Sequence, residues 1–463
     1  MKKIFKYTLL LGLSAGLLSS CGTDSLEPTL AQDKSVEGSV VNVGNLYSII
    51  KGMHSQLTAS GYYGQAAIIT NEVRSDNMFS NGNSGRYSTQ AEFKYNENTD
   101  YLWNNAYSVI ANANIVINTD VTTLDGDLAY GRHLQGEAIA IRALAHYDLL
   151  RSFGQQHAPS GDLGVPIVTT FKGDAESLSP SRNTVSEVKS AIYLDLEQAF
   201  GMMDVAYDSK IFISKYAAKA LEARVALYFG DWARARDAAK MVIDNGGYTI
   251  APAASFVSNW AGKEAGNSIF ELQYSGSDNA GNGSLAYMYR FPSDAPSGYG
   301  DAEAIANVID LYADGDVRKD ILGYQDAGTR LRNMGKYPDT VTNADNVPLI
   351  RIEEIVLIYA EALFEINNAD PMALTQLNMI TSNRGAAAHT MVTKDIILDE
   401  RRKELMFEGF RFDDLMRTGM SVDVIGSSQN LIETLSYPNN LFTYPIPAAE
   451  INANSNVVQN DGY

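Results

Sequence analysis

The chain has 463 residues, of which 45% are hydrophobic, so it is long enough and apolar enough to bury a large core. Its 55 acidic and 36 basic residues give a formal net charge of −19. This acidic balance argues against nucleic acid as a partner, because nucleic-acid binding needs a positive field.

The chain begins with the features of an exported lipoprotein. A basic segment (residues 1–6) precedes an apolar run from Tyr7 to Leu18, which is typical of a secretory signal peptide and shorter than the roughly 20 residues that span a membrane. A Leu, two small residues and Cys21 follow the pattern of the bacterial lipobox. We therefore predict that residues 1–20 are a signal peptide and that Cys21 carries the lipid.

An ordinary signal peptide beside a stray cysteine is the alternative, but Cys21 is the only cysteine in the chain. With Cys21 lipidated, no thiol is left for a disulfide, a metal site or a nucleophile. Cleavage after residue 20 removes three lysines and no acid, so the net charge falls from −19 to −22.

Residues 21–40 are polar and predict a flexible tether, and beyond Val41 most periodic stretches are helical, because apolar residues recur every three or four positions. No long Pro- or Ser-rich linker interrupts residues 41–463, so we expect a single, mainly α domain. The predicted helices cover Asn105–Asn118, Gly136–Leu150, Val185–Phe200, Lys215–Phe229, Ala233–Ile243, Ile352–Ile366 and Asp395–Met416.

Two pairs of these helices resemble tetratricopeptide helix pairs. In the first, a Gly-Asp turn at residues 230–231 precedes Ala235, Ala238 and Ala239, whose small side chains let two helices pack closely. The stretch Tyr359–Ala373 repeats this outline. Because the two copies lie far apart in the chain, we expect scattered helix pairs around one core rather than a regular solenoid.

The region Asn245–Asp345 is rich in Gly, Asn, Ser and Tyr and predicts loops with a few short strands, such as Ser268–Tyr274. Long irregular segments of compact proteins are usually functional or mobile, so we expect the ligand region at about residues 245–345. The acidic stretch Asp310–Asp320 lacks the spacing of a calcium loop, which leaves Ca²⁺ only as a minor alternative to a plain loop.

The C-terminal stretch Asp399–Arg417 predicts one charged helix. At about 100° per residue, Arg401, Glu404, Glu408 and Arg411 fall within roughly 80° of one another beside an apolar stripe. We interpret them as structural ion pairs, because lone buried charges are costly. A catalytic pair of Glu404 and Glu408 is the alternative, but neighbouring arginines would keep both ionised, whereas a general acid needs a raised pKa.

Residues 400–417 also closely resemble the C-terminal signature of the SusD/RagB family of Bacteroidota surface lipoproteins. The matches keep their order from the lipobox to the last residue, so the resemblance covers essentially the whole chain. Departures are small: Asn454-Ser455 stands where Asn-Pro is frequent, and Asp461 where Pro is common. Further matching stretches are Gly136–Ala138, Arg142–Ala143, Leu163–Ile167, Arg351–Ile355, Tyr359–Ala362 and Tyr444–Tyr463.

The resemblance implies a SusD-like fold with a scaffold of tetratricopeptide-like pairs. It also implies a lipid-anchored protein on the outer face of the outer membrane that caps a SusC-like TonB-dependent transporter. There it captures oligosaccharide or polysaccharide or, in some members, peptide. Asp24 and Glu27 fit the acidic surface-export signal of such lipoproteins.

Family members tend to bind ligand on surface loops, where aromatic rings stack on sugar C–H faces and polar side chains bond the hydroxyls. Packing of a loop onto the scaffold is the alternative for each aromatic, and we expect it for Phe93 and Phe291; Trp103, Trp232 and Trp260 should lie mostly in the core. The ligand-binding candidates are Arg74, Asn77, Phe79, Asn81, Arg86, Tyr87 and Tyr95 in one stretch and Tyr274, Asp278, Asn279, Tyr287, Tyr289, Arg290 and Tyr299 in another.

Enzyme signatures are missing from the sequence. It has no Gly-x-Ser-x-Gly elbow, no phosphate-binding Gly-x-x-x-x-Gly-Lys loop and no His-Glu-x-x-His helix, and its five histidines are isolated. We therefore expect a non-catalytic glycan-binding protein without a cofactor, with peptide binding as the alternative. A secreted glycoside hydrolase, whose two carboxylates would lie about 5–10 Å apart, and a helical scaffold without a small ligand are alternatives of other classes.

Overall fold

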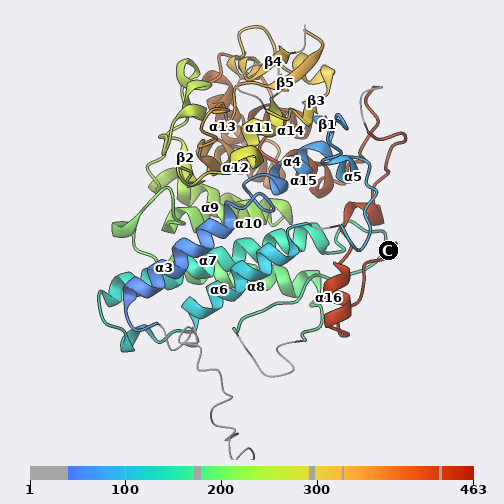
Figure 1. The fold of residues 1–463 in the computed structure, drawn as a ribbon. Helices are drawn as coiled ribbons and strands as arrows, with labels where there is room; N and C mark the ends of the chain where they lie inside the picture. The colour runs from blue at the N-terminus through green and yellow to red at the C-terminus, as the bar shows by residue number, and fades with distance from the viewer. Residues whose placement is uncertain (1–39, 100, 172–178, 291–297, 326–327, 427–429) are drawn as a thin grey trace, which may run out of the picture.

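The computed structural model describes residues 40–99, 101–171, 179–290, 298–325, 328–426 and 430–463. The predicted signal peptide, Cys21 and all of the tether except residue 40 lie outside these ranges. The described part is mainly helical, which confirms the predicted fold class (Figure 1). None of its helices is long and apolar enough to cross a membrane.

The lower layer in Figure 1 consists of α3 (Val43–Leu57), α6 (Trp103–Ile117), α7 (Leu128–Phe153) and α8 (Val185–Met202). Helix α7 begins after Asp127, whose carboxylate accepts hydrogen bonds from the backbone N–H groups of Ala129 and Tyr130. It packs against α6 and α8, and every residue from Gly136 to Phe153 is buried. Its small and apolar side chains suit a helix that is covered on most sides.

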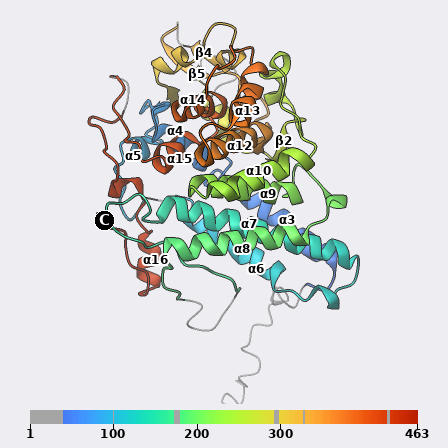
Figure 2. The ribbon, with the colours of Figure 1, turned by 180° about the vertical axis from the view of Figure 1, so that it is seen from behind.

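The two predicted helix pairs are α9 (Lys215–Tyr228) with α10 (Trp232–Asn245), and α12 (Ile352–Ile366) with α13 (Pro371–Ser382). Helices α10 and α12 pack against each other, and α8 packs against α9, so α9 and α10 lie between the lower layer and the α12–α13 pair in both views (Figures 1 and 2). The expectation of scattered pairs is therefore wrong. The chain between α10 and α12 leaves the array and returns to it, which the linear sequence does not reveal.

That excursion and the N-terminal loops lie in the upper part of Figure 1, together with α12, α13 and helices near the C-terminus. Within the described residues they form three antiparallel two-stranded sheets. Strand β2 (Ser268–Leu272) pairs with β6 (Val347–Arg351), and β6 leads the chain directly into α12. Strand β4 (Leu322–Gln325) pairs with β5 (Arg330–Asn333). Strand β1 (Met78–Ser80) pairs with β3 (Ala302–Ala304), which brings the two loop stretches with candidate ligand residues side by side.

Short helices connect these elements. The α-helices are α4 (Ala66–Val73), α5 (Ser88–Ala91), α11 (Leu285–Tyr289) and α16 (Ala448–Ala453). The 3-10 helices are Val121–Thr123, Val205–Tyr207, Ala253–Ser255, Ser258–Ala261, Gly281–Gly283, Ala306–Leu311, Val317–Ile321 and Asn440–Phe442.

The single helix predicted over Asp399–Arg417 is wrong, because the chain forms α14 (Lys394–Leu405) and α15 (Arg411–Arg417) with a tight turn between them. Phe407 and Gly409 adopt left-handed backbone angles, with φ of 70° and 83°. Gly409 lies so close to α4 that a Cβ there would be 2.9 Å from Cα of Ile68. A tertiary contact, absent from the helical pattern, therefore ends α14.

Trp103 and Trp260 are buried as expected, whereas Trp232 is only half-buried. Phe93 is buried in an aromatic cluster, in agreement with the packing role expected for it. Phe291 lies outside the described residues.

Candidate functional site

The four charged residues predicted to pair along one helix instead form ion pairs with other elements. Glu404 accepts hydrogen bonds from Arg384 Nε and Nη2 at 2.9 and 2.8 Å, and Arg351 Nη1 lies 3.3 Å away. Although burial acts to raise the pKa of Glu404, Arg384 and Arg351 outweigh it and hold the pKa well below its ordinary value. A carboxylate held ionised in this way is unsuited to general acid catalysis.

The other three residues have separate partners. Glu408 accepts from Lys336 Nζ at 2.6 Å, Arg401 lies 3.2 Å from Asp414, and Arg411 binds Asp76 at 2.6 Å. All four residues form ion pairs, and the turn after α14 directs their side chains toward partners on different elements.

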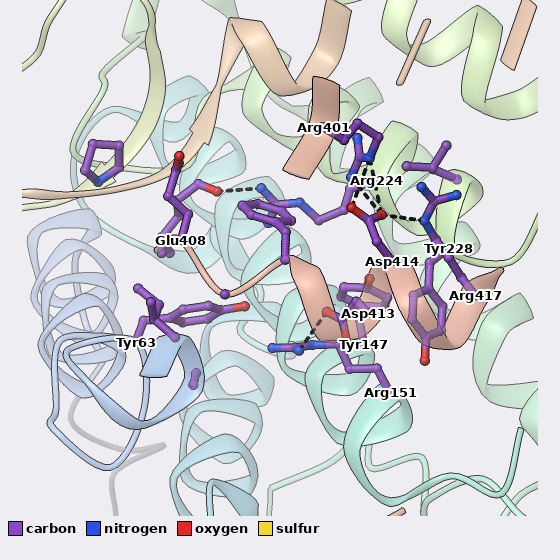
Figure 3. Close-up of a pocket in the computed structure, with 17 residues that line it drawn as sticks. Tyr63, Tyr147, Arg151, Arg224, Tyr228, Arg401, Glu408, Asp413, Asp414 and Arg417 are labelled. Atoms are coloured by element: carbon purple, nitrogen blue, oxygen red, sulfur yellow. Dashed lines mark hydrogen bonds and ion pairs between the residues drawn. The ribbon is translucent and has the colours of Figure 1, made fainter. Parts of the chain in front are cut away.

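A pocket lies where α4, α7 and α9 meet the α14–α15 turn (Figure 3). Charged pairs line it, including Arg151 with Asp413 at 3.0 Å and Arg401 with Asp414. Its free volume is about 40 Å³, which holds roughly three water molecules. That space is too small for a sugar ring, so we regard this pocket as part of the ion-paired core.

A larger hollow of about 410 Å³ lies on the upper sheets, and this volume falls within the range of small-molecule sites. The aromatic side chains on it are Phe79 of β1, which is half-buried, and Tyr324 of β4, which is 51% exposed. Arg330 of β5 adds a guanidinium group whose side chain is 36% exposed. The described residues that line the hollow are Phe79, Glu303, Ala304, Ala306, Tyr324, Thr329, Arg330 and Leu331.

Glu303 joins the elements around this hollow. It lies opposite Phe79 in the β1–β3 register, and its Oε1 accepts from Arg330 Nη1 at 2.7 Å and from Arg332 Nη2 at 3.1 Å. Asn81 Nδ2 donates to the same oxygen at 2.7 Å. One buried carboxylate thus connects β3, β5 and the loop after β1.

A second group of candidate residues meets beside β3. Arg86 Nη1 lies 3.0 Å from Asp301 Oδ2, and the Arg86 guanidinium lies 4.2 Å from the ring centroid of Tyr299. The rings of Tyr299 and Tyr287 contact edge to face, with centroids 4.9 Å apart. The structure therefore brings Phe79, Asn81 and Arg86 from one predicted stretch to Tyr287 and Tyr299 from the other.

Seven candidates are buried, with 9% exposure or less, so this structure does not present their side chains to a ligand at the surface. Several have polar partners inside the protein: Tyr274 donates to the Thr58 carbonyl at 2.7 Å and Tyr289 to the Phe407 carbonyl at 3.0 Å. Asp278 is exposed and Asn279 half-buried, but neither lines the hollow. The buried residues are Arg74, Asn77, Tyr87, Tyr95, Tyr274, Tyr289 and Arg290.

Tyr324, Thr329 and Arg330 were not among the residues predicted from the sequence. Their only sequence signal is an aromatic and a basic residue in a short stretch interrupted by glycine, which is weak. For metal binding, the described ranges contain no group of three or more His, Cys, Asp or Glu side chains that could hold an ion.

Comparisons with known proteins agree with this architecture. A model of the SusD family matches residues 303–463. A second family model, described as starch-binding and associating with the outer membrane, matches residues 31–227. The chain belongs to the SusD-like family. This confirms the resemblance seen in the C-terminal signature.

This SusD-like chain is 24% identical to SusD-like protein P2 of Formosa agariphila, across 96% of the chain and 98% of that relative. It is 35% identical over 133 residues to the starch-binding protein SusD of Bacteroides thetaiotaomicron, which covers 27% of this chain and 22% of that protein. A crystal structure of a putative sugar binding protein from Bacteroides vulgatus superposes with a TM-score of 0.83 at 28% identity, over 92% of this chain and 99% of that one.

Proposed function

We propose that this chain is a non-catalytic, cell-surface lipoprotein that captures oligosaccharide or polysaccharide at the Phe79–Tyr324 hollow and delivers it to a SusC-like TonB-dependent transporter. The observation that carries the proposal is the half-exposed ring of Tyr324 beside the Arg330 guanidinium, on a hollow of about 410 Å³. Membership of the SusD-like family supports it.

The chemistry of the hollow suits an uncharged face of a sugar. The rings of Tyr324 and Phe79 offer flat apolar surfaces for C–H groups, at little cost in side-chain entropy. Thr329 and Arg330 offer polar groups for hydroxyls. Asn81 and Glu303 are engaged with each other, so we assign them to shaping the hollow rather than to direct contact.

The composition of the hollow also favours binding over hydrolysis. Glycoside hydrolases use a pair of carboxylates about 5–10 Å apart. Among the described residues that line the hollow, Glu303 is the only acid, and it is bonded by Asn81, Arg330 and Arg332. This arrangement fits a structural carboxylate, and it supports the proposal that the protein is not an enzyme.

We extend the proposal to the N-terminal part of the chain, where residues 1–20 act as a signal peptide and lipidated Cys21 with residues 21–40 tethers a single domain of residues 41–463 to the outer membrane, facing outward. The family description that names the outer membrane supports this location. Incorporation of labelled palmitate into the wild type but not into Cys21→Ala would test the anchor, and protease digestion of intact cells would test the outward orientation.

Affinity electrophoresis against a panel of polysaccharides, and calorimetry against the same glycans and against peptides, tests the binding function. We expect Tyr324→Ala to raise the Kd for the bound glycan about tenfold, since loss of a stacked aromatic removes roughly 1–1.5 kcal/mol. Leu194→Ala is the control, because Leu194 is also a solvent-exposed apolar side chain but lies on α8, remote from the hollow.

Unchanged affinity in Tyr324→Ala would show that the ligand binds elsewhere. Shorter glycan products after incubation would favour a hydrolase. Binding of peptides but of no glycan would favour the peptide-binding alternative.

A further inference from the structure

Strand β1 begins after a short connection, Asp76-Asn77, that is held from outside the sheet by Arg402 of α14. Arg402 Nε donates to Asn77 Oδ1 at 2.8 Å, and Nη2 donates to the Asp76 carbonyl at 2.7 Å. Arg402 Nη1 lies 3.1 Å from Asp76 Oδ2. All three nitrogens of this guanidinium are therefore directed at the same two residues.

Asn77 connects this anchored segment to both strands beneath the hollow through hydrogen bonds. Its Nδ2 donates to Glu72 Oε2 at 3.0 Å, and its backbone N–H donates to Ser75 Oγ at 3.2 Å. Its carbonyl accepts from the backbone N–H of Ile305, the residue that follows β3, at 2.9 Å. Asn77 is thus fixed to α4, to α14 and to the end of β3.

Phe79 lies two residues beyond Asn77, about 7 Å along an extended chain. A rotation of the β1 start by about 10° would move Phe79 by roughly 1 Å, and binding groups need to be held to within about 0.5 Å. The position of Phe79 in the hollow therefore depends on the connection that Arg402 holds.

We propose that Arg402 is a positioning residue of the glycan surface: it touches no ligand, and it holds the connection from which β1 presents Phe79. The proposal rests on the proposed function, which makes the hollow a binding surface. The neighbouring Arg401 offers a contrast. It lies on the same helix and is buried, whereas the Arg402 side chain is 10% exposed, and Arg401 pairs with Asp414 on α15.

Arg402→Lys and Arg401→Lys form a matched pair, because each keeps its charge but replaces a three-nitrogen fork with a single ammonium. In the ligand-free protein, we expect Arg402→Lys to accelerate amide hydrogen exchange in β1 and at Ile305 about tenfold. The variant lacks two of the hydrogen bonds that Arg402 makes, so local opening of the strand costs less free energy. We expect its Kd for the glycan bound by the wild type to rise about fivefold. Arg401→Lys should leave both quantities unchanged, even where the two variants lose similar thermal stability.

The proposal would be overturned if amide exchange in β1 of Arg402→Lys were as slow as in the wild type. It would also be overturned if Arg401→Lys accelerated this exchange equally. Faster exchange without any loss of affinity would also overturn it, because β1 would then be held for stability alone. If the wild type bound no glycan of the panel, the proposed function would fail, whereas exchange in β1 would still decide whether Arg402 holds the strand.

Discussion

The carboxylate of Glu361 on α12 offers the sharpest test of the buried ion-pair network. It is fully buried, and Arg417 Nη1 and Nη2 donate to its two oxygens at 2.5 and 2.9 Å. Lys394 Nζ donates at 2.7 Å, and Arg401 Nε lies 3.9 Å away. Although burial acts to raise the pKa of Glu361, Arg417, Arg401 and Lys394 together hold it at about 2.

This lowered pKa sets the size and the pH dependence of the stability that ionised Glu361 gives the folded state. A fall from 4.5 to about 2 corresponds to about 3 kcal/mol of stabilisation of the folded state at pH 7. Because the folded pKa is depressed, the contribution is present above pH 4.5 and is lost as the pH falls toward 2. At pH 3 about half of it, roughly 1.5 kcal/mol, remains.

Glu361→Gln should therefore lower the free energy of unfolding by about 3 kcal/mol at pH 7 and by about half as much at pH 3, measured by urea denaturation. Glu365→Gln is the control, because Glu365 lies one turn further along α12 and pairs with the same Lys394, but its side chain is 26% exposed. We expect that control to lose less than about 1 kcal/mol. Equal losses in the two variants, or a Glu361→Gln effect that does not change with pH, would refute the reasoning.

Two further predictions concern the contact between α4 and the α14–α15 turn. Burial raises the pKa of Glu72 to about 7, despite hydrogen bonds from Asn77 and the Gly409 N–H. The protonated form is therefore favoured in the folded state, so stability from this group is full below pH 4.5 and is lost as the pH rises through 7. Glu72→Gln should flatten the thermal stability profile between pH 5 and 8, and an unchanged slope would contradict the raised pKa. Gly409→Ala should lower the free energy of unfolding by about 1–3 kcal/mol, because alanine disfavours φ of 83° and its Cβ would be 2.9 Å from Cα of Ile68. Gly276→Ala, at a site with open space around it, is the matched control in thermal denaturation.

Helices were predictable where one periodic pattern extends along the chain. The ranges Val185–Phe200, Lys215–Phe229 and Ile352–Ile366 agree with α8, α9 and α12 to within two residues. The break between α14 and α15 was not predictable, because it depends on the close approach of Gly409 to Ile68 on α4. A helical pattern carries no information about such a contact between distant segments.

The candidate site, like the helices, was predictable from the sequence only in part. Loop aromatics were a sound guide to the region, and β1 and β3 do bring Phe79 and Tyr299 to the same side of the protein. Composition does not distinguish a buried Tyr289 from an exposed Tyr324, however, because both are tyrosines in Gly-rich stretches. Burial depends on which element covers the ring, and only the folded chain contains that information.

The sequence by itself determined the helical class and the family, through local periodicity and a C-terminal signature whose residues are adjacent in the chain. It also carried the charges of the ion-pair network, since buried arginines and glutamates must be paired to be tolerated. Only the tertiary structure decided their partners, the stacking of α10 on α12 and the position of the hollow. Each of these depends on contacts between residues far apart in sequence, which backbone turns such as the one at Gly409 bring together.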